Sequence, residues 1–236
     1  MSIEVENVCS GYYGDFDVIH NFSLHAEKSK ITCIIGPNGC GKSTLMKTIY
    51  GFLKPRKGRV SHGGFDITGT EPHVMLLRGI SYIPQARNIF PYLSVYENLK
   101  MGAWLFRKDR LWVDEAIDRI FEMFPILKER EKVRAISLSG GEQKMLEIGR
   151  ALIPNPEVIL IDEPTAGLAP KIAHEIYKTL EGFKERGLTV LMVDQNVRQA
   201  IAFSDYLYVM EFGENKDEGS REKFESEMKK LIRSWI

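Results

Sequence analysis

The sequence predicts an α/β fold: a mostly parallel sheet with an antiparallel β layer at its N-terminal end and a helical insertion. Residues 1–35 contain strand-like runs in which apolar and polar side chains alternate. The runs VILID (158–162) and TVLMVD (189–194) are short and continuously apolar, which is typical of strands buried on both faces of a parallel sheet. Residues 86–154 instead show helical periodicity with few β-branched runs.

The strand-like runs IEVENV, FSLHA and ITCII follow one another, which suggests an antiparallel β layer that leads into a core strand. Turn residues separate these runs: Gly11, Gly14, Asp15 and Asn21. A helix follows and is predicted to end at Gly51, before the helix-breaking cluster KPRKG. The run RVSHGGFDI and the run ISYIP at residues 80–84 are the next expected β segments.

The helical insertion is clearest in the run VDEAIDRIFEMF. Apolar residues recur there at i, i+4, i+7 and i+11, as on one face of an amphipathic helix: Val113, Ile117, Ile120 and Phe124. We therefore expect a single domain over residues 1–236. Residues 1–85 and 155–236 are expected to form its core with the β layer, and residues 86–154 its helical subdomain.

Composition excludes some classes of partner. The 32 basic and 32 acidic residues give a formal net charge of zero, so no general attraction to nucleic acid or anionic lipid is expected. The cysteines Cys9, Cys33 and Cys40 match no zinc or redox spacing, as in a protein of the reducing cytosol. No leader is visible, and no apolar run approaches the roughly 18 residues of a spanning helix. We expect a chain that is soluble by itself and has no nucleic acid partner.

A glycine-rich stretch, GPNGCGKS at residues 36–43, lies between the strand ITCII and the predicted helix. It matches the phosphate-binding pattern G-x-x-x-x-G-K-[ST] in the required context, which predicts the core of a P-loop NTPase. Main-chain N–H groups converge on phosphate oxygens, Lys42 reaches the β and γ phosphates, and the Ser43 hydroxyl coordinates Mg²⁺. The alternative is a glycine-rich turn that only caps the helix. The residues predicted to hold ATP and Mg²⁺ here are Gly36, Pro37, Asn38, Gly39, Cys40, Gly41, Lys42, Ser43 and Thr44.

Cys40 lies inside this loop, beside Lys42 and a helix N-terminus. Such surroundings favour a thiolate, and alkylation of a reactive Cys40 would block ATP binding. A small residue that only fills space is the interpretation that we favour.

Two acidic residues end the buried run VILID and follow it. Asp162 is expected at the carboxyl end of the strand, facing the Mg²⁺ of the loop, and Glu163 is expected to polarise the attacking water. Carboxylates at the end of a buried strand are costly unless a metal or a reaction uses them. The alternative is that both acids cap the helix after Pro164. We interpret the pair as the hydrolytic centre of an ATPase, with Glu163 as its general base.

Four further stretches accompany these motifs: LSGGE (138–142), Gln85 in YIPQ, EPTAGL after Asp162, and Tyr12-Tyr13. Together the motifs resemble the ATP-binding cassette of ABC transporters over essentially the whole chain. LSGGE is decisive, because other P-loop ATPases lack it. The runs FPILKERE, LSGGEQKMLEIGRAL and AGLAP further resemble the ATPase subunits of branched-chain amino acid importers.

The resemblance gives LSGGE a role in a second nucleotide site. It implies that Ser139, Gly140, Gly141 and Glu142 close over the ATP held by the P-loop of a partner cassette. The residues precede a helix whose apolar positions are expected to hold it on the core: Met145, Ile148 and Leu152. The helix N-terminus would then face an anion. A helix cap alone would account for Ser139 but not for both glycines.

The resemblance also assigns Gln85 to Mg²⁺ or to the attacking water. Gln85 would report the γ-phosphate to the helical subdomain, where membrane subunits dock in this family; an ordinary loop amide is the alternative. Tyr12 best matches the aromatic residue that stacks on adenine, with Tyr13 one residue away. Simple strand packing is the alternative for either tyrosine.

Two positions depart from the family pattern. Gln195 stands where the family usually has a histidine that contacts the γ-phosphate, and a glutamine amide donates a hydrogen bond but holds no charge. Ala169 replaces an acid that the family uses for crosstalk between the two nucleotide sites. These departures predict slow turnover and pairing with a second, different ATPase subunit, with a homodimer as the alternative.

The C-terminal segment is a third departure. EFGENKDEGS stands where the family has a more apolar hairpin. The following helix has an apolar face that is expected to dock on the core rather than on a membrane surface: Phe224, Met228, Leu231 and Trp235.

The expected function is that of a cytoplasmic ATPase subunit of an importer, held at the inner face of the cell membrane by transmembrane permease subunits. Glu163 and Gln195 are the expected catalytic residues, and Ser43, Gln85 and Asp162 the expected metal ligands. Branched-chain amino acids are the expected solute by resemblance alone, with urea or short amides as alternatives. A non-transport soluble ABC ATPase and a low-activity regulatory nucleotide-binding subunit remain alternative functions.

Overall fold

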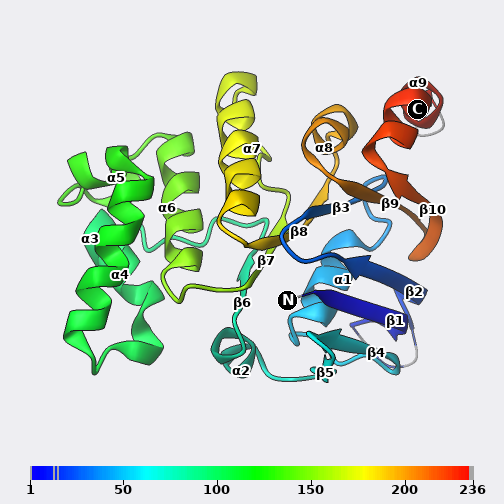
Figure 1. The fold of residues 1–236 in the computed structure, drawn as a ribbon, viewed down its shortest axis with the longest axis horizontal. Helices are drawn as coiled ribbons and strands as arrows, with labels where there is room; N and C mark the ends of the chain where they lie inside the picture. Colours follow the sequence, from blue (N-terminus) through cyan, green and yellow to red (C-terminus); the bar gives the residue numbers. More distant parts are fainter. Residues whose placement is uncertain (1, 13, 15, 234–236) are drawn as a thin grey trace.

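The computed structural model describes residues 2–12, 14 and 16–233, which form two β-sheets with helices around them (Figure 1). The smaller sheet is antiparallel and has the strand order β2-β1-β4-β5. Its strands are β1 (Ile3–Ser10), β2 (Ile19–Ala26), β4 (Lys57–His62) and β5 (Phe65–Asp66). The run RVSHGGFDI thus forms part of β4 and the short strand β5, and the predicted N-terminal β layer is confirmed.

The larger sheet has the strand order β10-β9-β3-β8-β7-β6. Its strands are β3 (Ile31–Ile35), β6 (Ile80–Ile83), β7 (Val158–Asp162), β8 (Thr189–Asp194), β9 (Tyr206–Glu211) and β10 (Glu214–Ser220). All neighbours from β9 to β6 pair in parallel, and β10 adds an antiparallel edge. The predicted α/β class with a mostly parallel sheet is confirmed. The carboxyl ends of β3, β8 and β7 therefore meet at one edge of this sheet.

Two apolar cores cover the two faces of the larger sheet. Because side chains alternate along a strand, Val190 and Met192 of β8 join one core, and Leu191 and Val193 join the other. The helices α7 (Pro170–Glu185) and α8 (Val197–Phe203) cover the first face. The helix α1 (Lys42–Ile49) lies on the second face, between the two sheets (Figure 1). Burial on both faces accounts for the continuously apolar runs in the sequence.

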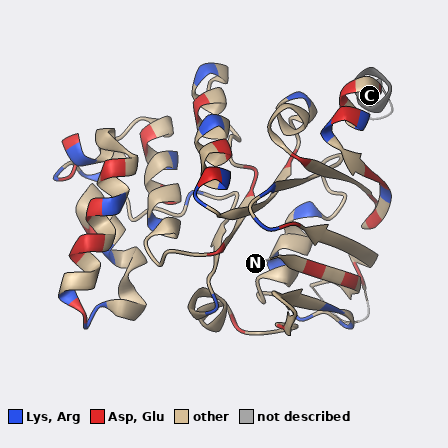
Figure 2. Cartoon of the chain, in the orientation of Figure 1, with Lys and Arg blue, Asp and Glu red and all other residues tan. Residues whose placement is uncertain are grey.

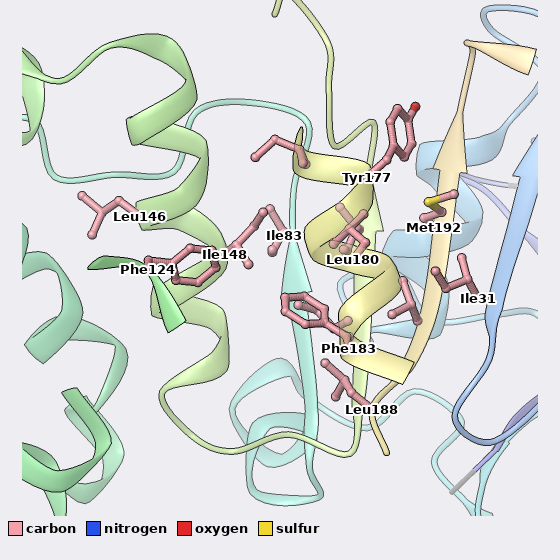
Figure 3. Close-up of a cluster of buried hydrophobic side chains, with 14 of the residues drawn as sticks. Ile31, Ile83, Phe124, Leu146, Ile148, Tyr177, Leu180, Phe183, Leu188 and Met192 are labelled. Carbon is pink, nitrogen blue, oxygen red and sulfur yellow. The ribbon is translucent and has the colours of Figure 1, made fainter. Parts of the chain in front are cut away.

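The stretch after β6 is helical, as predicted. Its helices are α3 (Val95–Gly102), α4 (Arg110–Met123), α5 (Pro125–Glu129) and α6 (Gly140–Leu152), with 3₁₀ turns at Trp104–Phe106 and Ala135–Ser137. The four apolar residues predicted around α4 are all buried. Figure 3 shows the first core extending from Phe124 and Leu146 in this region to Leu180 and Met192 beside the sheet. A shared core joins the helical region to the sheet.

The helix α6 is buried more completely than its sequence predicts. Ile148 is fully buried, as expected, whereas Met145 and Leu152 are only partly buried against the same core. Leu146, which the predicted apolar face omitted, is fully buried. The helix packs against both α3 and α7, so more than one of its faces is covered.

Two further helices complete the described chain. The helix α2 (Pro72–Leu77) precedes β6, and α9 (Arg221–Arg233) follows β10 and contacts α8 and β9. The run EFGENKDEGS forms the last residue of β9, the turn and the whole of the polar, largely exposed strand β10. Phe224 is buried in the core, which supports docking of α9 on the domain. The side chains of Met228, Leu231 and Trp235 lie outside the described part of the chain.

Charged residues of both signs are mixed along the helices (Figure 2). On α7 basic and acidic residues follow one another along the helix, whereas on α4 acidic residues predominate, with Arg110 and Arg119 among them. No helix within the described ranges is long and apolar enough to cross a membrane.

Replacing Gly51 with alanine is expected to destabilise the domain far more than replacing Gly64. Both glycines have a left-handed backbone, with φ of 84° and 83°, so alanine costs about 1–2 kcal/mol at either position. A Cβ at Gly51 would also lie 1.8 Å from the Thr70 carbonyl oxygen, whereas nothing lies within 4 Å of one at Gly64. Overpacking adds about 1–3 kcal/mol for Gly51→Ala. Urea unfolding measures the difference, and equal midpoints for the two variants would contradict this account.

Candidate active site

The loop after β3 is held close to the turn between β9 and β10. A Cβ at Gly36 would lie 2.2 Å from the Met210 carbonyl oxygen, so only glycine fits there. The Gly213 N–H donates to the Cys40 carbonyl oxygen at 2.8 Å. The hairpin β9–β10 therefore contacts the loop at Gly36 and Cys40 and holds it in place.

The helix α1 begins directly after this loop with an open N-terminus. Gly41 is its N-cap, with φ of 114°, and no side chain in the described part of the chain caps the helix. The first N–H groups and the positive end of the helix dipole thus remain available to an anion. The Lys42 Nζ donates to the carbonyl oxygens of Gly36 at 2.7 Å and Pro37 at 3.0 Å. This buried ammonium adds positive charge at the same point.

A cavity of about 300 Å³ opens beside the loop and the start of α1. It is lined by eight of the predicted site residues and by Val18: Asn38, Gly39, Gly41, Lys42, Ser43, Thr44, Gln85 and Glu163. Segments that lie far apart in the sequence therefore meet at one cavity with the chemistry of a phosphate site.

The acidic residues at the end of β7 contact the predicted partners directly. The Ser43 Oγ donates to Asp162 Oδ1 at 3.1 Å, and the Gln85 Nε2 donates to Glu163 Oε2 at 2.7 Å. Burial raises the pKa of the Asp162 carboxyl, while the hydrogen bond from Ser43 opposes that rise. The arrangement joins the P-loop, the end of β7 and the loop after β6.

Glu163 has an unusual backbone conformation. Its φ is 48°, in the left-handed region, and its N–H donates to the Val193 carbonyl oxygen at 3.0 Å. A non-glycine residue in this region costs about 1–2 kcal/mol. The left-handed conformation turns the chain sharply after Asp162, and the Glu163 side chain lines the cavity. Such strain is common at functional sites.

The donor set of the site suits Mg²⁺. The Ser43 hydroxyl and the Asp162 carboxylate approach each other, and the Gln85 amide lines the same cavity. Mg²⁺ prefers oxygen ligands and is usually held by one or two carboxylates together with phosphate oxygens. The buried carboxyl of Asp162, whose charged form burial disfavours, fits a cation ligand.

Cys40 is a buried, small residue in this setting. Burial raises the pKa of its thiol, and the nearby Lys42 only partly opposes that rise. The reactive-thiolate hypothesis is therefore wrong in direction, and the space-filling interpretation agrees with a side chain that packs beside Gly36.

The LSGGE residues lie at the start of α6, away from the P-loop cavity. Ser139 and Glu142 form a capping box, in which the Glu142 N–H donates to Ser139 Oγ and the Ser139 N–H donates to Glu142 Oε2. A Cβ at Gly141 would lie 2.6 Å from Ile172 Cγ2, so packing against α7 accounts for this glycine. The helix begins at Gly140, which is exposed.

Tyr12, Gln195 and Ala169 do not line this cavity, and Tyr12 lies instead at the wall of a neighbouring groove. The Tyr12 hydroxyl is 3.2 Å from Lys47 Nζ, and Lys47 also covers the Tyr12 ring. Tyr13 lies outside the described residues. Gln195 is exposed just after β8, and Ala169 is the N-cap of α7 without a side-chain cap. Val18, which reaches the cavity from the segment before β2, carries no sequence signal of its own.

A buried ion pair behind the site also escaped the sequence analysis. The Lys144 Nζ lies 2.6 Å from Glu147 Oε2, and both residues are buried in α6. Glu147 Oε1 accepts a hydrogen bond from the Asn88 N–H at 2.8 Å. The pair thus ties the loop that contains Gln85 to the helix that begins at LSGGE. Only the i, i+3 spacing of opposite charges was visible in the sequence.

The fold and the site define a P-loop ATPase. A family model described as ABC transporter matches residues 19–166. The chain is 41% identical, over 86% of its length and 87% of the relative, to a protein of Pseudomonas aeruginosa named high-affinity branched-chain amino acid transport ATP-binding protein BraG. It is 39% identical to the probable branched-chain amino acid transport ATP-binding protein LivF of Archaeoglobus fulgidus, over 85% of each chain. The chain belongs to the ABC transporter ATP-binding family and is an ATPase of that family.

The chain is also similar to an export ATPase and to solved structures of ATP-binding cassettes. The lipopolysaccharide export system ATP-binding protein LptB of Haemophilus influenzae is 36% identical over 89% of this chain and 87% of its own. The crystal structure of a nucleotide-free ATP-binding cassette from an ABC transporter matches with a TM-score of 0.89 and 35% identity, over 100% and 99% of the chains. A dimeric, post-hydrolysis ATP-binding cassette bound to ADP and Pi matches with a TM-score of 0.76 and 26% identity, over 93% and 98%.

Removing Glu147 alone is expected to destabilise the domain by about 3–5 kcal/mol, because Glu147→Ala leaves the Lys144 ammonium buried without its partner. The double variant Lys144→Met, Glu147→Leu removes both charges and is expected to recover most of this loss. Chemical unfolding of both variants beside the wild type measures the difference. A double variant as unstable as Glu147→Ala would show that the charge pair is not the source of the effect.

Proposed function

We propose that this chain is the ATP-hydrolysing subunit of an importer for branched-chain amino acids. The observation that carries the ATPase part is the pair of contacts Ser43–Asp162 and Gln85–Glu163 at one phosphate-binding cavity. The names of two similar proteins, BraG and LivF, support the solute. The likeness to a lipopolysaccharide export protein makes the solute and the direction of transport the parts that most need an experiment.

In the proposed mechanism, the N-terminal amides of α1 and the Lys42 ammonium bind the β and γ phosphates. Ser43, Asp162 and Gln85 would hold Mg²⁺, which neutralises charge on the phosphate oxygens when it is bound. Glu163 accepts the proton of the attacking water, and its hydrogen bond from Gln85 fixes the carboxylate beside the metal ligands.

The start of α6 is proposed to serve the nucleotide of a second cassette. LSGGE is absent from the P-loop cavity of its own chain, and Gly140 is exposed at a helix N-terminus that can receive an anion. A similar cassette is dimeric with ADP and Pi. We propose a heterodimer, because Gln195 and Ala169 make this chain's own complement of nucleotide-site residues incomplete.

Permease subunits are proposed to dock in an apolar groove of about 800 Å³ beside the loop that carries Gln85. Aromatic and aliphatic side chains from α1, α2 and the segments around them line it, including Tyr50, Phe52, Leu76 and Tyr82. Phe52 is 55% exposed although it contacts both tyrosine rings. An exposed apolar groove of this kind marks an interaction site. Docking there would place the chain at the cytoplasmic face of the membrane without a membrane span of its own.

A second candidate function is a regulatory subunit that binds ATP and turns it over slowly. The exposed, neutral Gln195 favours it, because a glutamine amide offers the γ-phosphate no charged donor. Hydrolysis by the chain alone and with a partner cassette distinguishes the two functions, since fast hydrolysis by the chain alone excludes the regulatory one.

The variant Glu163→Gln is expected to bind ATP as the wild type does and to lose turnover by about 10²–10⁴-fold. The amide keeps the shape and a hydrogen bond to Gln85 but cannot accept the proton of the water. Equilibrium binding of ATP and single-turnover hydrolysis measure the two effects separately. Hydrolysis at the wild-type rate would refute the general-base role.

The variant Phe52→Glu is expected to abolish co-purification with permease subunits and uptake of labelled leucine in reconstituted vesicles. A buried carboxylate in the groove would lose its hydration on docking, whereas ATP hydrolysis by the free chain stays unchanged. Phe65→Glu is the matched control, since Phe65 is exposed on β5, outside this groove. Loss of uptake with both variants, or with neither, contradicts the groove as the docking site. Uptake of urea instead of leucine would change the solute and leave the groove in place.

A further inference from the structure

Asp194 is a buried carboxylate at the end of the central strand β8. The strand lies between β3 and β7, and Asp194 is only 2% exposed. By alternation along the strand it faces the same side as Met192, toward α7 and α8. Its Oδ1 accepts the N–H of Asn196 at 2.8 Å, which closes the turn that contains Gln195.

Tyr177 of α7 supplies the second partner of this carboxylate. Its hydroxyl donates to Asp194 Oδ2, and the Thr165 Oγ1 donates to the Tyr177 hydroxyl at 3.3 Å. The ring is fully buried and stacks on Phe203 at 5.2 Å between ring centroids. In Figure 3 the hydroxyl points away from the apolar cluster around Leu180. The Tyr177 ring therefore packs against apolar neighbours, and its hydroxyl makes hydrogen bonds with Thr165 and Asp194.

Thr165 belongs to the turn that follows Glu163. The Ala166 N–H donates to the Glu163 carbonyl oxygen at 3.3 Å, and the Leu168 N–H donates to the Thr165 carbonyl oxygen at 3.1 Å. One hydroxyl of α7 is thus the link between the turn with Glu163 and the turn with Gln195. The two turns otherwise share the hydrogen bond from the Glu163 N–H to Val193.

Packing alone does not account for the polar atoms of this chain of contacts. Phenylalanine would fill the space of the Tyr177 ring and stack on Phe203 equally well. A buried hydroxyl and a buried carboxylate cost free energy unless both are hydrogen-bonded, so their presence calls for a use. Burial raises the pKa of the Asp194 carboxyl, and the hydrogen bond from Tyr177 is the largest effect that opposes the rise.

We propose that Tyr177 is a positioning residue for hydrolysis: the contacts Thr165–Tyr177–Asp194 hold the turn of Glu163 and the turn of Gln195 in fixed register across the γ-phosphate. The inference rests on the proposed roles of Glu163 and Gln195. Neither Tyr177 nor Asp194 lines the phosphate cavity, so both act through the residues that they hold.

The variant Tyr177→Phe tests the proposal. We expect its kcat for ATP hydrolysis to fall about tenfold, the equivalent of one hydrogen bond to a charged group, while its KM stays within about twofold. Tyr208→Phe is the matched control, because Tyr208 is also buried and its hydroxyl also accepts a hydrogen bond, from the His25 N–H at 2.9 Å, away from the site. A fall in kcat with Tyr208→Phe as large as that with Tyr177→Phe would reduce the effect to general destabilisation and overturn the proposal.

The pH dependence of kcat is a second readout, which a general loss of folding stability would not shift. Without the Tyr177 hydroxyl the pKa of Asp194 rises further, so the acid limb of kcat is expected to move to higher pH. The titratable groups that face Asp194 are Tyr177 of α7, Cys33 of β3 and Glu163 after β7, with Lys42 of α1 acting on the same Cys33 thiol. Cys33→Ala is expected to leave the acid limb where it is in the wild type, and a shift as large as that of Tyr177→Phe would assign the effect to the thiol.

The variant Thr165→Val keeps the proposal testable if Tyr177→Phe folds poorly. It removes the other end of the contacts and leaves the bond between Tyr177 and Asp194 intact. We expect its kcat to fall too, and the double variant Thr165→Val, Tyr177→Phe to lose less than the product of the two single losses. A wild-type kcat for both single variants overturns the positioning role. If Glu163→Gln hydrolyses ATP normally, the general-base assignment fails instead, whatever Tyr177→Phe does.

Discussion

The site depends on one physical constraint: β3, β8 and β7 of the larger sheet are buried on both faces and run parallel, so their polar carboxyl ends meet at a single edge. At the end of β3 this edge presents the P-loop and the N-terminus of α1, and at the end of β7 it presents Asp162 and Glu163. A charge at such a place is costly unless something neutralises or binds it. Asp162 and Glu163 receive partners from distant segments, Ser43 and Gln85, whereas Lys42 is held by carbonyl oxygens of its own loop.

These partners are of a kind that a nucleotide can replace. The Lys42 ammonium is held by neutral carbonyl oxygens of its own loop, and phosphate oxygens are stronger acceptors because they are charged. Asp162 accepts the Ser43 hydroxyl and a 3.4 Å contact from Tyr82, both weak beside a divalent cation. Asp194 differs, because Tyr177 and a backbone N–H hold it away from the cavity. When nucleotide and Mg²⁺ bind, Lys42 and Asp162 would therefore exchange their present partners for phosphate and metal, whereas Asp194 would keep its own.

The sequence predicted the fold and the phosphate site well because both depend on local patterns. The runs ITCII and VILID are continuously apolar since both faces of each strand are covered, and GPNGCGKS is one uninterrupted stretch of sequence that forms the loop and the start of α1. What it could not predict were contacts between residues far apart, such as Glu147 with Asn88 and Tyr177 with Asp194. Gly141 shows a related limit: its packing against Ile172 of α7 is a tertiary reason for glycine that no local pattern reveals. The reactive-thiolate alternative for Cys40 failed because burial outweighs Lys42, and burial cannot be read from loop composition.

The departures at Gln195 and Ala169 affect the two proposed nucleotide sites unequally. Gln195 follows β8 in the sheet that also carries the P-loop, and a neutral donor offers about 0.5–1.5 kcal/mol against about 1.5–3 kcal/mol for a charged one. The difference corresponds to roughly tenfold slower turnover at that site. The position of the amides at the start of α6 does not depend on Gln195. The capping box of Ser139 and Glu142 fixes that end of the helix. In a two-cassette sandwich this chain would therefore offer the partner's ATP an intact start of α6 while turning over its own ATP slowly, which is the physical reason to expect two different subunits.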